Sequence, residues 1–155
     1  MDQILLITHV IAAMMWTGAV FMAALVDWPA FKRQAPAGRF PFQAVIGQGS
    51  GVFPWVYLAM TIMLLSSVGL AWRHWPSDGF GCVLLGLKAA ALSFMVGSTV
   101  YGTLRTWPTL QFATDNEAFT IYGRYMVRAY LIFGCGVAGH VAGLLFSRRA
   151  EWFGY

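Results

Sequence analysis

The stretch ILLITHVIAAMMWTGAVFMAALVDWPAF, from Ile4 to Phe31, decides the fold class. Its part from Ile4 to Val26 contains no Asp, Glu, Lys or Arg. About 20 apolar residues are enough to cross the hydrocarbon core of a bilayer as a helix. A cleaved signal peptide opens with basic residues, and none precedes Lys32, so we expect a retained membrane helix. His9, close to the start of this run, is the one ionisable group inside it.

The composition extends this interpretation to the whole chain. Hydrophobic residues make up 59% of the 155 residues and charged residues only 10%, whereas about 25% is usual for soluble globular chains. So few polar groups cannot cover a water-facing surface, and the bilayer is the expected solvent. The net charge of +4 does not indicate nucleic acid, because membrane proteins carry Lys and Arg in the loops on one side.

Four apolar runs predict four membrane helices, at about 4–26, 53–72, 80–104 and 127–146. We therefore expect an all-α, four-transmembrane-helix bundle that forms a single domain over residues 1–155. The first and third connections, about 27–52 and 105–126, are long and polar, and the second is short. Pro29, Pro54, Pro76 and Pro108 are expected near helix ends, because proline breaks helix interiors. All the tryptophans except Trp16 are also near ends, as in interfacial aromatic belts.

A shift of 79 residues aligns the two halves of the chain. It places Trp28-Pro29 on Trp107-Pro108, Gly18 on Gly97, and His9 on Lys88. We interpret this as a duplicated helix pair, although Trp-Pro is also common at the ends of membrane helices.

Both termini are expected on one side, called side A here, and the two long connections on the other, called side B. Side B carries six basic residues and side A three, which favours side B as the cytoplasmic face of a bacterial inner membrane. The six are Lys32, Arg33, Arg39, Arg105, Arg124 and Arg128. The termini are then expected in the periplasm.

Three ionisable residues fall in one layer of the expected bundle. At ~1.5 Å per residue, His9, Lys88 and His140 each lie roughly 8–12 Å below side A. Ionisable groups inside a bilayer are costly and commonly mark function. The acidic residues are expected in loops, which excludes a carboxylate metal site within the membrane.

Two neutral imidazoles on antiparallel helices can supply the axial ligands of one haem iron, or part of a copper site. Small residues beside them, Gly136 and Gly143 near His140 and Ala13 near His9, would give a flat macrocycle room, and Arg73 would face its propionates. The alternative is that Gly139-x-x-x-Gly143 packs helices and that each His hydrogen-bonds a hydroxyl across the bundle. Lys88 is either a functional group or a snorkelling side chain.

The motifs His9, Trp16-Thr17-Gly18 and Pro29 resemble the opening helix of the copper resistance D (CopD) membrane family. The stretches 53–72 and 86–102 resemble the second and third helices of that family. The chain is also similar to the related HemJ membrane protoporphyrinogen oxidases, which pair a first-helix His with a third-helix Lys, here His9 and Lys88. The resemblance implies redox or metal handling in the membrane, and adds Trp16 to the cofactor residues.

Three functions follow as expectations. The first is a CopD-like protein with haem b, or else copper, between His9 and His140, and with Lys88 as electrostatic partner or catalytic residue. It would pass electrons to a quinone or a partner protein. The second is a haem-dependent oxidoreductase of the HemJ kind. The third is a cofactor-free accessory subunit of a larger membrane complex, or a homo-oligomer.

Overall fold

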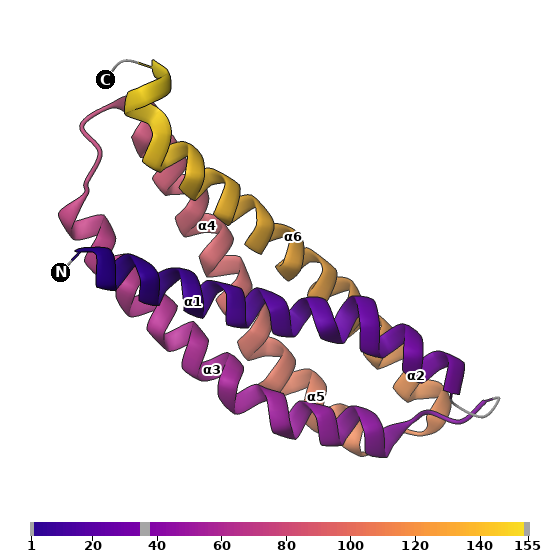
Figure 1. Cartoon of the computed structure of the whole chain (residues 1–155). Helices are drawn as coiled ribbons and strands as arrows, with labels where there is room; N and C mark the ends of the chain where they lie inside the picture. The colour runs from indigo at the N-terminus through magenta and orange to yellow at the C-terminus, as the bar shows by residue number, and fades with distance from the viewer. Residues whose placement is uncertain (1, 35–37, 154–155) are drawn as a thin grey trace.

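The computed structural model describes residues 2–34 and 38–153 and is all-α, as the sequence predicts. Four long rods form an antiparallel bundle (Figure 1). The first is α1 (Asp2–Phe21), η1 (Met22–Asp27) and α2 (Trp28–Gln34), and the second is α3 (Phe42–Arg73). The third is α4 (Gly79–Tyr101), η2 (Gly102–Thr106) and α5 (Trp107–Gln111), and the fourth is α6 (Asp115–Phe153). The segments η1 and η2 are π-helical.

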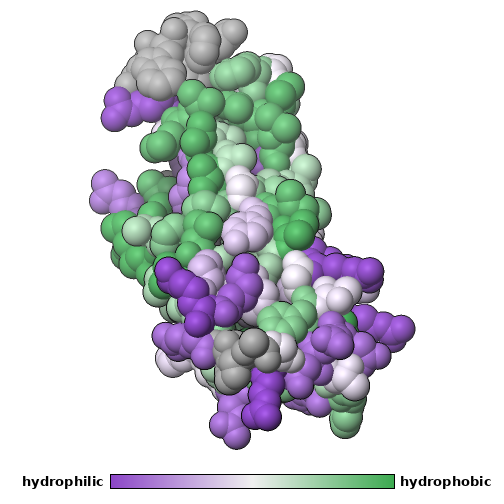
Figure 2. Space-filling view, turned by 90° about the vertical axis from the view of Figure 1, so that its right-hand side faces the viewer, coloured by the Kyte–Doolittle hydropathy of each residue, from purple (hydrophilic) through white to green (hydrophobic). Residues whose placement is uncertain are grey.

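Among the described residues, four helices are long and apolar enough to span a membrane: Gln3–Gln34, Phe42–Arg73, Gly79–Gln111 and Asp115–Arg148. Large apolar side chains cover their outer surfaces, among them Ile4, Leu65, Val68, Leu104 and Leu144. Figure 2 shows this apolar surface, with hydrophilic residues gathered at the lower end of the view. The chain is therefore an integral membrane protein whose helices contact lipid.

Each expected span lies inside a longer helix. At ~1.5 Å per residue, a rod of 32 residues is about 48 Å long, which exceeds the ~30 Å of a hydrocarbon core. The added turns lie at side B, where α3 begins at Phe42 and α6 at Asp115. The long loops predicted there are thus mostly helical. Asp27 lies in η1 rather than in a loop, and Pro54 lies inside α3 rather than at its end.

An aromatic cluster explains why the side-B extensions are helical although they contain many polar residues. Trp28, Phe40, Trp107 and Tyr122 are buried together in one hydrophobic cluster at side B. Their rings meet edge-on or tilted, with Trp28 and Tyr122 centroids 4.8 Å apart. Because Trp28 is 7% and Trp107 8% exposed, the prediction that they belong to a lipid-facing aromatic belt is wrong.

The two halves of the chain repeat one local structure. In each half a π-helical segment, η1 or η2, interrupts the rod and is followed directly by a Trp-Pro pair whose tryptophan, Trp28 or Trp107, is buried. These positions are related by the same shift of 79 residues that aligns the sequence. The π-helical interruption is therefore part of the repeated unit, as a duplicated helix pair predicts.

The rods associate in two pairs. Helix α1 packs mainly on α3, and α4 mainly on α6, while α1 against α6 joins the pairs. The pairs come together at side B and diverge toward the end that holds both termini (Figure 1). One buried cluster lies at side B, and the other surrounds Trp16, Met60 and Met95 near the middle of the rods. The ionisable layer lies beyond both clusters, where the pairs diverge.

Candidate functional site

His9 is buried on α1 and is held by α3. Its Nδ1 lies 2.9 Å from Ser66 Oγ. The Ser66 hydroxyl has one hydrogen, which it donates to the backbone carbonyl of Ile62 at 2.7 Å. A Ser66 hydroxyl that donates to Ile62 can accept from His9 Nδ1–H, and in that tautomer Nε2 keeps its lone pair.

His140 on α6 is hydrogen-bonded by its own helix. Its Nδ1 lies 2.7 Å from the carbonyl oxygen of Gly136, one turn earlier. A carbonyl oxygen only accepts, so Nδ1 of His140 carries a proton. A neutral ring with its proton on Nδ1 has the lone pair on Nε2, which is the form in which histidine binds metals with its second nitrogen hydrogen-bonded.

Lys88 reaches from α4 toward α6 in this layer. Its Nζ lies 3.3 Å from the point where a Cβ on Gly143 would stand. Lys88 thus lies against α6 at Gly143, three residues from His140 in the sequence.

The small residues predicted around the histidines have other roles. A Cβ at Gly136 would overlap Thr17 Cγ2, so Gly136 provides close contact between α6 and α1. Gly143 accommodates Lys88 in the same way. Ala13 is buried, and its carbonyl accepts a 2.6 Å hydrogen bond from the Thr17 hydroxyl. The space beside both glycines is thus occupied by neighbouring side chains.

Trp16 and Arg73 lie away from the histidines. Trp16 is seven residues beyond His9, or about 10 Å along α1, inside the central cluster. Arg73 is the last residue of α3 and is exposed at side A.

No three His, Cys, Asp or Glu side chains of the described ranges gather where they could hold one ion. A haem needs only axial ligands from the protein, since the porphyrin supplies the others. Gly136, one turn from His140, is in close contact with Thr17 of α1.

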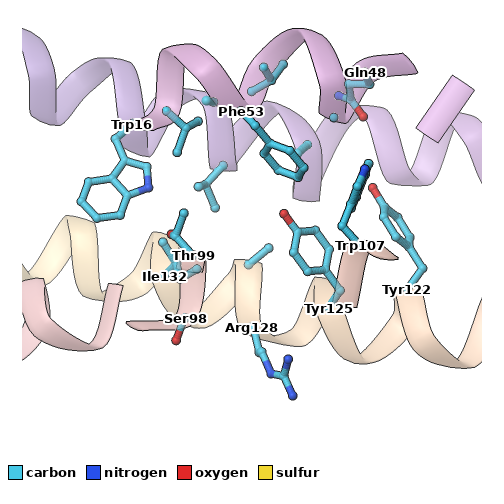
Figure 3. A pocket seen from close by; sticks show the side chains of 17 residues that line it. Trp16, Gln48, Phe53, Ser98, Thr99, Trp107, Tyr122, Tyr125, Arg128 and Ile132 are labelled. Carbon is cyan, nitrogen blue, oxygen red and sulfur yellow. The ribbon is translucent and has the colours of Figure 1, made fainter. Parts of the chain in front are cut away.

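Sequence reasoning missed an internal cavity between the middle of the bundle and side B. It has a volume of about 60 Å³, and its lining includes Trp16, Gln48, Thr99 and Tyr125 (Figure 3). The sequence feature that indicates this cavity is a helical spacing that places four residues on one face of a helix. These residues are Tyr122, Tyr125, Ala129 and Ile132. It was overlooked because residues up to 126 were expected to form a loop.

Comparison of the chain with protein-family models, curated proteins and solved structures finds no match. The candidate site therefore rests on the chemistry of its own residues.

Proposed function

We propose that this membrane protein is CopD-like and binds haem b between α1 and α6, with His9 and His140 as axial ligands, to pass electrons within the membrane. The observation that carries the proposal is the hydrogen bonding of both rings. Nδ1 of His9 contacts Ser66 Oγ and Nδ1 of His140 contacts the Gly136 carbonyl, so Nε2 is the nitrogen of each ring that could bind a metal.

The position of the histidines along the bundle supports the same proposal. His9 and His140 are both on the side-A side of the close contact between Thr17 and Gly136, so a ligand between them would lie at the level of the ionisable layer.

Lys88 is the electrostatic partner in this proposal. A bound haem would supply a one-electron redox centre. A positive charge beside such a centre favours its reduced form, because reduction removes one positive charge. Lys88→Met should therefore lower the reduction midpoint potential while the haem remains bound.

The test is a dithionite-reduced minus oxidised spectrum of the protein purified in mild detergent, with metal analysis of the same sample. We expect a b-type α band that disappears in both His9→Ala and His140→Ala. His74→Ala is the matched control and should keep the band, because His74 lies at the side-A connection. A colourless protein without stoichiometric copper would contradict the proposal and favour an accessory subunit.

The location of Lys88 in the same layer as His9 favours one second candidate, an oxidoreductase of the HemJ kind. In that protein His9 and Lys88 would both be required, and His140 would not. Protoporphyrinogen oxidation by wild type and by His140→Ala, but not by His9→Ala or Lys88→Ala, would support it. Loss of the haem band in His140→Ala would favour the bis-histidine carrier.

A further inference from the structure

The indole nitrogen of Trp16 lacks a hydrogen-bond partner. Trp16 is 0% exposed, and its Nε1 is the buried side-chain atom of the described ranges for which no partner is present. Leaving such a donor unsatisfied is unfavourable, because no hydrogen bond compensates for the loss of its hydration. Indole N–H only donates, so an acceptor must come from outside the protein chain.

The internal cavity adjoins this donor. Trp16 lines its central end, and the indole nitrogen points into it, while Gln48 and Tyr122 lie toward side B (Figure 3). The Tyr125 hydroxyl also points into the space between the helices (Figure 3). The cavity thus combines apolar aromatic walls with polar groups along its length.

The volume of the cavity selects the size of its occupant. A buried water needs about 10–15 Å³, so 60 Å³ holds a few waters. A cavity that binds a benzene ring is about 150 Å³, which excludes an aromatic ligand such as a quinone ring.

The charges around the cavity favour a neutral occupant. Arg128 is turned away from the space, with its guanidinium 4.3 Å from the Tyr101 ring centroid and hydrogen-bonded to Thr106 (Figure 3). The carboxylate of Asp27 accepts a hydrogen bond from Gln48. Both charges nearest the cavity are therefore already engaged by the protein.

We propose that this cavity is a water-binding site in which water accepts the hydrogen bond of Trp16 Nε1–H and extends toward Gln48 and side B. It lies on the opposite side of Trp16 from His9, so it is independent of the proposed haem function.

Radiolytic hydroxyl-radical labelling of the full chain in lipid nanodiscs tests this site. Radicals form from bound water during an X-ray pulse and oxidise adjacent aromatic side chains, which mass spectrometry then locates. Trp28 is the internal control, because it is 7% exposed, packed by Phe40 and Tyr122, and outside the cavity lining. We expect Trp16 to be oxidised several-fold faster than Trp28, although it is the less exposed of the two.

Ala129→Leu is designed to fill the cavity and should reduce Trp16 oxidation to the rate of Trp28 or below. Oxidation of wild-type Trp16 no faster than Trp28 would overturn the proposal, as would fast oxidation that persists in folded Ala129→Leu. If Ala129→Leu does not fold, Trp16→Phe replaces it, and oxidation of Tyr125 is then expected to fall because the water loses its donor. Unchanged Tyr125 oxidation in Trp16→Phe would likewise overturn the proposal.

Discussion

At position 136, the lack of a side chain lets α6 touch α1. Gly136→Ala should gain up to about 1 kcal/mol in helix propensity. The overlap of the new Cβ with Thr17 Cγ2 should cost about 1–3 kcal/mol, so the net effect is destabilising. Thermal unfolding in detergent should show a lower Tm. Gly139→Ala is the matched control and should not lower the Tm, since nothing lies within 4 Å of that position.

The same contact predicts a rescue. Thr17→Ser removes the methyl group that overlaps the Cβ introduced by Gly136→Ala, and it keeps the hydroxyl that bonds Ala13. The double variant Gly136→Ala with Thr17→Ser should therefore recover most of the lost Tm, which a double-mutant cycle measures as a coupling energy. Strictly additive effects would mean that this contact does not hold α1 against α6.

Ser66 is expected to act on the candidate site through His9. Ser66→Ala removes the acceptor that holds the Nδ1 proton of His9, so its imidazole loses its orientation. Removing such a partner commonly lowers metal affinity by about 10–100-fold. Haem titration of the apoprotein measures this loss. Ser67→Ala, the neighbouring substitution, should leave haem affinity unchanged, and equal affinity in both variants would contradict the role of Ser66.

The sequence could predict the depth of His9, Lys88 and His140, because depth follows from counting residues along a helix. It could not predict which way each side chain turns, since rotation about a helix depends on its neighbours. For this reason Gly136 was expected to face a macrocycle and instead faces Thr17. Trp16 was expected among the cofactor-binding residues through a family resemblance, and it lines the internal cavity instead.

At the scale of elements, the four helices were predictable and their side-B extensions were not. Hydropathy averages over a window, and the extensions mix polar residues with buried aromatic ones. Phe40, Trp107 and Tyr122 bury apolar surface only after distant segments meet. Tertiary packing then stabilises helices that local hydropathy does not indicate.

This explanation predicts that the repeated tryptophans stabilise the fold equally. Trp28→Ala and Trp107→Ala should each cost about 3–5 kcal/mol, the usual loss for a buried Trp. Trp72→Ala is the exposed control, at 86% exposure, and should change stability by less than about 0.5 kcal/mol. Thermal or denaturant unfolding of the three variants would make the comparison. A small effect at Trp28 and Trp107 would mean that the cluster does not hold the extensions together.

At the scale of the whole molecule, the two ends of the bundle differ in construction. Side B is closed by the aromatic cluster and by a 2.6 Å hydrogen bond from the Phe40 amide to Asp115. Side A carries the ionisable layer between diverging helix pairs. The aromatic cluster can therefore keep the four rods in register at side B.

The two ends of the bundle also differ in charge, and this difference predicts how the protein is oriented in its membrane. Side B holds most of the Lys and Arg, and such residues remain preferentially in the cytoplasm. Ser77 is exposed in the side-A connection and Asn116 at the side-B start of α6. In a chain without its native cysteines, Ser77→Cys should react with a membrane-impermeant maleimide in intact bacterial cells with a permeabilised outer membrane. Asn116→Cys should react only after the inner membrane is lysed. The reverse pattern of labelling would contradict this orientation and would place the termini and the His9 layer on the cytoplasmic side.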